Sequence, residues 1–254
     1  MTEPQKPQYL ESPNGRLAYR LREGDPNLAG VVWFGGYRSD MLGSKASRLD
    51  EFCAGENIPF LRFDYSGHGE SGGNFEDGTI GQWAADAQAI IDRVFDRPVI
   101  IIGSSMGAWI AVLFALARAD RVRGAIFIAP APDFTERLMV PTFTQDDWDA
   151  IERHGRLEIA SDYGGEPYIY TKAFLDDARK QCVLHQPIKL PGTIRFLHGL
   201  RDEVVPLSHV VEFASKIDNQ AVHITLLKDG DHRLSTEDNL ELLMASVRAA
   251  IDAA

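Results

Sequence analysis

The sequence lacks the features of a disulfide-stabilised, membrane-spanning or nucleic-acid-binding protein. Its two cysteines, Cys53 and Cys182, lie far apart and form no Cys-x-x-Cys pair, so we expect small buried side chains and no disulfide framework. The longest apolar run, 109–117, is shorter than the about 20 residues that cross a bilayer. Acidic residues outnumber basic ones, 37 to 26, and the formal net charge of -11 argues against binding to nucleic acid or an anionic membrane.

The beginning of the chain shows no targeting pattern. Residues 1–8 contain neither the apolar segment of a secretory signal nor an Arg-rich amphipathic pattern, so we expect a cytoplasmic protein. No group of His, Cys and Asp has metal-ligand spacing, and no Gly-x-Gly-x-x-Gly opens a helix, so neither a metal nor a nucleotide cofactor is expected. The 254 residues suffice for a single domain spanning 1–254.

What the sequence does contain is a regular alternation of strand and helix patterns. Short apolar runs predict buried strands, and stretches with apolar residues at helical spacing separate them. Such alternation is typical of an α/β fold, with a mostly parallel sheet covered by helices on both faces. A hairpin over 9–21, with Asn14-Gly15 as its turn, is expected to precede it. The predicted strands are 30–34, 58–64, 99–102, 124–129, 193–198 and 221–227, and the predicted helices are 42–55, 79–95, one directly after residue 105, 207–217 and 240–251.

One connection is far longer than the others. About sixty residues separate the predicted strands 124–129 and 193–198, where two to six are usual, so we interpret residues 131–190 as an inserted lid. Helices are expected over 144–153 and 172–181. The apolar side chains of the lid are expected either to line an acyl pocket or to form the lid's own small core. Met139, Phe143 and Trp148 are predicted to bind substrate, within a wider set that includes Leu138, Val140, Tyr168, Tyr170 and Phe174.

A glycine-flanked serine stands where the strand 99–102 meets the next helix. The segment Gly103-Ser104-Ser105-Met106-Gly107 fits the Gly-x-Ser-x-Gly pattern of a nucleophile elbow. The turn in such an elbow is so tight that a Cβ two residues before or after the serine would strike neighbouring backbone. Ser105 is therefore predicted to hold its hydroxyl at a helix N-terminus, where free amides and the helix dipole favour negative charge.

A serine nucleophile needs a base that takes its proton and a carboxylate that orients the base. Asp202 follows the predicted strand 193–198, and His232 follows the last one, 221–227, so we expect both at the sheet edge that carries Ser105. The chain order Ser, Asp, His is the one found in hydrolases with such an elbow. The alternatives for the base are His68, His154, His185 and His198, none of which lies in the loop after the last predicted strand. The alternatives for the acid are Glu203, next to Asp202, and Asp231, next to His232; Asp202 is preferred because its loop position fits and Asp231 is expected to point away from its own neighbour.

Two main-chain amides are predicted to stabilise the oxyanion of the reaction intermediate. One belongs to Met106, next to the nucleophile, and the other to Tyr37, in the loop after the predicted strand 30–34. The ring of Tyr37 is expected either to wall the substrate pocket or merely to pack beside it. Arg38 is a second substrate-binding candidate, because its guanidinium matches a carboxylate; the alternative is a solvated arginine.

Several segments make the chain resemble a known group of enzymes. They are Gly36-Tyr37, Gly43-Ser44-Lys45-Ala46, Arg62-Phe63-Asp64-Tyr65-Ser66-Gly67, Gly103-Ser104-Ser105-Met106-Gly107-Ala108-Trp109, Cys182-Val183-Leu184-His185, Leu197-His198-Gly199, and Asp231-His232-Arg233 with Asp202. On these segments the chain is similar to the α/β-hydrolase superfamily and, within it, to the palmitoyl-protein thioesterases also described as mycophenolic acid acyl-glucuronide esterases, with their bacterial relatives. The resemblance implies Ser105 as nucleophile, Asp202 as acid and His232 as base. It also implies hydrolysis of acyl thioesters or activated esters without a cofactor.

The chain departs from that group at its beginning. The animal enzymes look like mitochondrial import precursors, whereas this chain starts Met1-Thr2-Glu3-Pro4, so neither the organelle nor its protein substrates are expected to carry over. We therefore predict a serine hydrolase that acts through an acyl-enzyme intermediate on a small-molecule ester or thioester, with an acylated protein as a further substrate class. A cofactor-free perhydrolase or haloperoxidase, and a ligand-binding protein on a hydrolase scaffold, are the alternatives.

Overall fold

The fold is organised around a central β-sheet. The computed structural model describes residues 5–159 and 167–254, and within them the sheet has eight strands in the order β1-β2-β4-β3-β5-β6-β9-β10. Neighbouring strands from β4 to β10 are parallel, whereas β1 and β2 form an antiparallel hairpin at one edge, as predicted. The strands are β1 (Gln8–Ser12), β2 (Gly15–Arg22), β3 (Gly30–Phe34), β4 (Phe60–Phe63), β5 (Val99–Ser104), β6 (Val122–Ile128), β9 (Thr193–Gly199) and β10 (Val222–Leu227).

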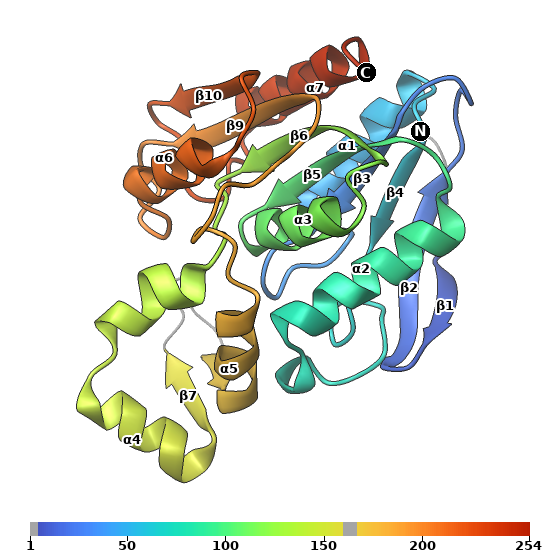
Figure 1. The fold of residues 1–254 in the computed structure, drawn as a ribbon. Coiled ribbons are helices and arrows are strands. Elements are labelled where there is room, and N and C mark those ends of the chain that lie inside the picture. The colour runs from blue at the N-terminus through green and yellow to red at the C-terminus, as the bar shows by residue number, and fades with distance from the viewer. Residues whose placement is uncertain (1–4, 160–166) are drawn as a thin grey trace.

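Helices cover both faces of this sheet. The apolar sides of α2, α3 and α6 pack on the face turned toward the viewer in Figure 1, and those of α1 and α7 pack on the opposite face. The predicted α/β fold is thereby confirmed. The helices are α1 (Ser44–Gly55), α2 (Ile80–Val94), α3 (Met106–Ala117), α6 (Leu207–Lys216) and α7 (Glu237–Ile251), with a short turn η1 (Phe75–Asp77) before α2.

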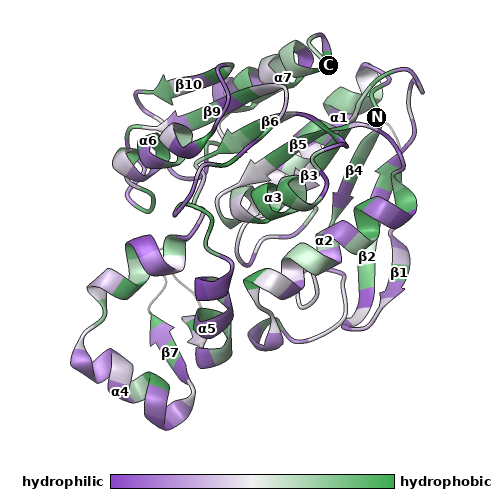
Figure 2. Ribbon diagram, in the orientation of Figure 1, coloured by the Kyte–Doolittle hydropathy of each residue, from purple (hydrophilic) through white to green (hydrophobic). Residues whose placement is uncertain are grey.

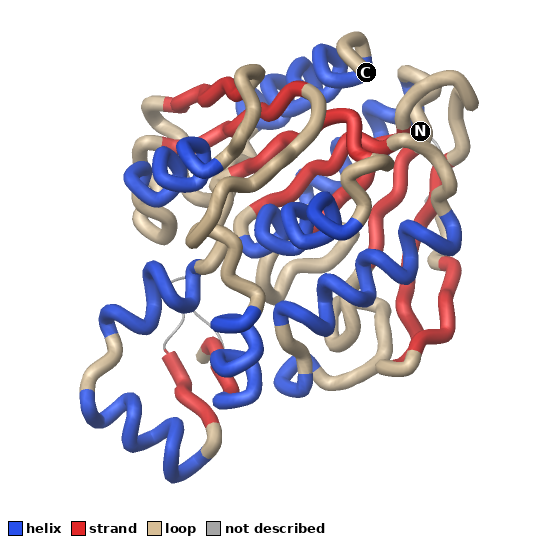
Figure 3. Tube along the Cα trace, in the orientation of Figure 1, coloured by secondary structure: helices blue, strands red, loops and turns tan. Residues whose placement is uncertain are grey.

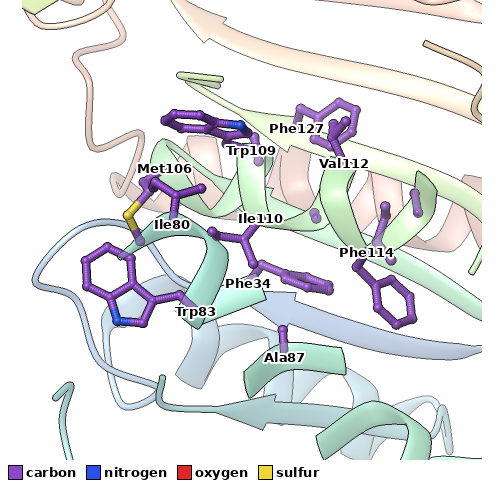
Figure 4. Close-up of a cluster of buried hydrophobic side chains, with 14 of the residues drawn as sticks. Phe34, Ile80, Trp83, Ala87, Met106, Trp109, Ile110, Val112, Phe114 and Phe127 are labelled. Carbon is purple, nitrogen blue, oxygen red and sulfur yellow. The ribbon is translucent and has the colours of Figure 1, made fainter. Parts of the chain in front are cut away.

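The helix α3 lies at the centre of the larger core. It is apolar on all sides, and nine of its twelve residues are buried, which is the pattern of a helix enclosed by other elements. Figure 2 shows it as one of the most hydrophobic helices. Figure 4 shows the side chain of Met106, at its first position, turned toward Ile80 and Trp83 of α2. This packing fixes the beginning of α3 against its neighbours.

The last helix begins one turn earlier than predicted. The apolar pattern starts at Leu240, but α7 starts at Glu237, because the Thr236 side chain accepts a hydrogen bond from the Asn239 amide and caps the helix. The polar first turn contributes no apolar residue to the pattern. Periodicity therefore locates the buried part of the helix and misses its capped end.

Residues 131–190, called the insertion below, form a separate group of elements between β6 and β9. Figures 1 and 3 show them beyond the end of the sheet, with α5 next to α2. The predicted helices are present, and α4 starts with a capping box between Thr144 and Asp147. The carboxylate of Asp133 accepts hydrogen bonds from the amides of Val183 and Leu184 and so joins the two ends of the insertion. Its elements are η2 (Thr135–Met139), η3 (Val140–Thr142), α4 (Gln145–His154), β7 (Arg156–Ile159), β8 (Tyr168–Thr171) and α5 (Lys172–Lys180).

The sequence analysis predicts no strands in the insertion, yet β7 and β8 form an antiparallel pair. Only Leu157 of β7 and Tyr170 of β8 are buried, so neither strand carries the alternation of apolar and polar residues that marks a half-buried strand. Residues 160–166, where a polar stretch is predicted, lie outside the described residues.

Candidate active site

Ser105 occupies the sharp turn between β5 and α3. Its backbone has φ 55° and ψ -122°, a left-handed conformation that costs energy for any residue with a Cβ. The amide of Ser105 donates to the carbonyl of Ile128 at 2.9 Å, and its carbonyl accepts from the amide of Ala131 at 3.1 Å. These bonds to the end of β6 and the residues after it hold the strained residue in place.

The two flanking glycines are required by close approach. A Cβ on Gly103 would lie 2.6 Å from the Cα of Ala108, and a Cβ on Gly107 would lie 2.1 Å from the carbonyl oxygen of Phe34. Both distances are impossible for real atoms, so the turn and the contact between α3 and the end of β3 need glycine at these positions.

His232 and Asp202 complete a hydrogen-bonded chain with Ser105. Nε2 of His232 lies 3.1 Å from Oγ of Ser105, and Nδ1 of His232 lies 2.9 Å from Oδ2 of Asp202. The loops that carry the two residues follow the parallel neighbours β9 and β10, and they are joined by a hydrogen bond from the amide of Arg201 to the carbonyl of Gly230. The structure thus brings His232 together with Asp202, 30 positions away in the sequence, and with Ser105, 127 positions away.

The environment of Asp202 favours its ionised form. The side chain is fully buried, which by itself opposes ionisation, but hydrogen bonds from His232 and from the amides of Val204 and Val205 outweigh burial and lower the pKa of this carboxyl. The alternative acids lie elsewhere. Glu203 is exposed, and Asp231 accepts a hydrogen bond from the amide of Leu234.

Two of the alternative histidines are buried, but neither contacts Ser105 in the hydrogen bonds described. Nδ1 of His198 lies 3.7 Å from Oδ2 of Asp202, the same oxygen that lies 2.9 Å from Nδ1 of His232, and burial lowers the pKa of His198. His68 packs edge-on against Tyr65 and Trp83, and burial lowers its pKa to about 4. His68 is therefore neutral at neutral pH and belongs to the core.

Residues 35–39, called the 35–39 turn below, run beside the nucleophile. The amide of Ser39 donates to the carbonyl of Gly36 at 3.1 Å, and the position a Cβ would take on Gly36 is 3.5 Å from Cβ of Ser105. Tyr37 lies within this turn, and Met106 directly follows Ser105. The two residues whose amides are predicted to bind the oxyanion thus lie on the two segments that border the serine.

The side chains of Tyr37 and Arg38 reach the insertion. Oη of Tyr37 donates to the carbonyl of Ile169 at 2.9 Å, and Nη1 of Arg38 donates to the carbonyl of Pro167 at 2.9 Å. Of the other predicted substrate-binding residues, Met139, Phe143 and Trp148 are half-buried in the insertion, and the rings of Phe143 and Trp148 pack edge to face. Their part in binding substrate stays a prediction.

Lys45 supports the loop that carries His232, and the sequence analysis does not predict this role of Lys45. Its Nζ donates to the carbonyl of Arg233 and lies 3.5 Å from Oγ of Ser235. Burial lowers the pKa of Lys45 to about 8, although the charge of Asp231 opposes this shift. A lysine in the first turn of a helix is unfavourable, because its charge opposes the helix dipole. This placement of Lys45 in α1 is the feature of the sequence that could have indicated a specific role for it.

A parallel sheet that presents a serine at a strand-to-helix turn, bonded to a histidine and a buried aspartate from later loops, defines an α/β-hydrolase. The chain belongs to the alpha/beta hydrolase family, whose sequence pattern matches residues 30–245. It is accordingly a hydrolase. In the described residues, no three His, Cys, Asp or Glu side chains gather as a metal site would require.

Several proteins of that family are similar to this chain along most of its length. The chain is 37% identical over 245 residues to the mouse protein named palmitoyl-protein thioesterase ABHD10, mitochondrial. The aligned region covers 95% of this chain and 80% of that protein. A crystal structure of a hydrolase from Agrobacterium vitis S4 superposes with a TM-score of 0.94 at 35% identity, covering 98% of this chain and all of the other. The structure of mouse alpha/beta hydrolase domain-containing protein 10 gives 0.89 at 34% identity, covering 97% and 98%.

These relatives correct the expected location. The rat, cattle and human proteins carry the same name as the mouse protein, including the word mitochondrial, so the prediction of a cytoplasmic protein is wrong on this comparison. The composition of a folded domain does not specify a compartment, because addresses are read by receptors from separate segments. No helix among the described residues is both long enough and apolar enough to cross a bilayer.

Proposed function

We propose that this hydrolase cleaves acyl thioesters and carboxylic esters by acyl transfer to Ser105, with His232 as general base and Asp202 as the residue that orients it. The observation that carries the proposal is the continuous chain of hydrogen bonds from Ser105 through His232 to a buried aspartate. The similarity to proteins named palmitoyl-protein thioesterase supports the acyl thioester as the substrate class.

The geometry supports a two-step reaction. His232 takes the proton of the Ser105 hydroxyl through Nε2 while the oxygen attacks the acyl carbonyl, and the amides of Met106 and Tyr37 bind the oxyanion. The intermediate collapses, the bond to sulfur or oxygen breaks, and His232 returns the proton to the leaving group. Water, deprotonated by His232, then attacks the acyl-enzyme and releases the acid, and the proton returns to Ser105. Asp202 stabilises the imidazolium in both steps, and no cofactor is required.

We propose further that the chain is one domain in which the insertion covers the site and contacts the acyl group. A group of aromatic rings from the insertion and from the sheet side meets next to the 35–39 turn, and such apolar surface suits an acyl chain. A small-molecule thioester and an acylated protein both present that chain. The rings are those of Tyr37, Phe75, Trp83, Phe134, Tyr168, Tyr170 and Phe174.

A fluorophosphonate probe tests the nucleophile. We expect the wild type to be labelled and to hydrolyse a p-nitrophenyl ester, and Ser105→Ala to lose the label and at least about a thousandfold in kcat. Ser104→Ala is the matched control, because Ser104 is the preceding, buried serine, and it should still be labelled. Labelling of Ser105→Ala, or unchanged turnover by it, would contradict the proposal.

Substrate choice is tested with acyl-CoA thioesters and p-nitrophenyl esters of graded acyl length. If the aromatic rings bind the acyl chain, kcat/KM should rise with chain length by about fourfold per methylene, since each buried CH₂ contributes about 0.8 kcal/mol. A flat dependence on chain length would reject the rings as the acyl site and leave the role of Ser105 untouched.

A further inference from the structure

The 35–39 turn, which carries the proposed oxyanion donor Tyr37, is bonded to the sheet and to the insertion. On the sheet side, Oη of the fully buried Tyr65 lies 3.3 Å from the carbonyl of Gly35. Gly107 of α3 packs directly on the carbonyl of Phe34, which precedes the turn. The beginning of the turn is therefore fixed by the part of the protein that also fixes Ser105.

The end of the turn is fixed by the insertion. The hydrogen bonds of Tyr37 and Arg38 go to the carbonyls of Ile169 and Pro167, two residues apart on one extended segment that includes β8. Successive carbonyls of an extended chain point in opposite directions, so these two point the same way. One edge of this segment thus receives two consecutive side chains of the turn.

Ring packing strengthens this connection. The ring of Tyr37 stacks on that of Tyr170, with centroids 5.3 Å apart and planes inclined by 19°. The guanidinium of Arg38 lies 5.8 Å from the centroid of Tyr168. Tyr168 and Tyr170 belong to β8, so the strand supplies both rings and the acceptor of Ile169, and Pro167, the other acceptor, directly precedes it.

The turn needs such support because its backbone is strained. Arg38 has φ 55°, at a position of the turn where glycine is the usual residue because a Cβ disfavours positive φ. A residue in this conformation persists when surrounding contacts determine it. Arg38 and Tyr37 make those contacts with the insertion, and Tyr37 carries the amide proposed to bind the oxyanion.

We infer that β8 and the residue before it set the geometry of the oxyanion hole, with the Tyr37 phenol and the Arg38 guanidinium as positioning residues. The inference rests on the proposed function, since it assigns a task to the insertion in the same reaction. A side chain of Tyr37 bound to the insertion orients the main-chain N–H of the same residue toward the substrate carbonyl. The insertion then acts on kcat for every acyl group, including those too short to touch its rings.

The test measures hydrolysis of p-nitrophenyl acetate, whose acyl group has two carbons. Tyr37→Phe keeps the ring and removes only the hydrogen bond to Ile169, and we expect kcat to fall up to about tenfold with KM within about twofold. Arg38→Met should act in the same direction. The double variant should lose less than the product of the two effects, because both side chains hold one turn.

A second readout separates positioning from general structure. A trifluoromethyl ketone forms a tetrahedral adduct with a nucleophilic serine, so its inhibition constant should rise in Tyr37→Phe by the same factor by which kcat/KM falls. Tyr19→Phe is the control, because it removes the hydrogen bond of a buried tyrosine to Gln8, on the hairpin of β1 and β2, and should change neither value.

Two outcomes would overturn the inference while the proposed function stands: acetate turnover by Tyr37→Phe and Arg38→Met equal to that of Tyr19→Phe, or a rise in KM confined to long acyl chains. The first would show that the turn keeps its geometry without the insertion, and the second that these residues only bind acyl groups. Wild-type turnover that survives in Ser105→Ala would instead reject the proposed function itself, and the inference with it.

Discussion

The helix-covered sheet and the insertion are built in different ways. The sheet is filled with aliphatic strand residues such as Val31, Val32 and the buried run Val99–Ile102, each enclosed on both faces. In the insertion α4 buries only Ile151, and the rings of Tyr170 in β8 and Phe174 in α5 meet the ring of Tyr37. Buried residues of the insertion such as Leu157 and Phe174 belong to the same hydrophobic cluster as one face of the sheet, so the insertion shares its buried surface with the sheet.

This difference separates two tasks. Ser105, Asp202 and His232 all lie at the ends of strands of the sheet, and Ser105 is held by Ile128 of β6 and by Ala131, the first residue of the insertion. The insertion also approaches the site through its contacts with the 35–39 turn and the rings around Tyr37. The strand ends of the sheet thus carry the three hydrogen-bonded side chains, and contact with the substrate is the part proposed for the insertion.

The largest effect is expected from changing the sheet side of the site. Asp202→Asn cannot stabilise the imidazolium of His232 and favours the wrong tautomer, so kcat should fall by about a thousand- to ten-thousandfold. Steady-state ester hydrolysis checks this. Glu203→Gln changes the neighbouring exposed acid and should stay within about twofold of the wild type. Equal losses in both variants would break the claim that the buried aspartate alone orients the base.

Stability distinguishes the two regions next. Phe114→Ala removes a fully buried ring from α3 and should cost about 3–5 kcal/mol of unfolding free energy, whereas Trp148→Ala in the insertion, where the ring is half-buried, should cost no more than about 1–2 kcal/mol. Denaturant titration followed by circular dichroism measures both. Similar costs would show that the insertion is packed as tightly as the sheet.

A smaller effect is expected from pH. The pKa of His68 is about 4 in the folded protein and 6.5 without the burial, so between these values the unfolded chain binds a proton that the folded protein does not. The free energy of unfolding is therefore not reduced by His68 above pH 6.5, and it falls by up to about 3 kcal/mol as the pH drops to 4. Denaturant titrations at several pH values measure the slope.

His68→Phe should make that slope shallower, although His198 and His209, whose pKa values burial also lowers, will keep part of it. His223→Gln replaces an exposed histidine on β10 and should leave the slope unchanged. A slope in His68→Phe as steep as in the wild type would show that His68 reaches water in the folded protein.

Much of the sheet and its site could be predicted from the sequence, because the signals there are local. Runs of branched apolar residues locate β3 and β5. Glycine is required on both sides of Ser105, because a Cβ there would lie only 2.6 or 2.1 Å from neighbouring backbone atoms. Asp202 and His232 could be chosen because parallel strands bring the loops after their carboxyl ends to one edge.

The insertion gave weaker signals. Its two helices have amphipathic patterns, whereas β7 and β8 are four residues each with a single buried residue, so they show no alternation of buried and exposed positions, although the aromatic and β-branched residues of β8 favour a strand. The supporting roles of Lys45, which bonds the carbonyl of Arg233, and of Asp133, which joins the ends of the insertion, depend on main-chain atoms far away in the sequence.

By itself the sequence determined the kind of fold, the residue that bends the chain after β5, and the acid and base expected beside it, because periodicity and steric demands act between near neighbours. Only the tertiary structure decided which carboxylate meets His232, that the phenol of Tyr37 bonds the insertion, and what supports the loop of His232. The reason is physical: the partner of a side chain 132 residues away in the sequence depends on how the whole core packs, and a local pattern carries no information about it.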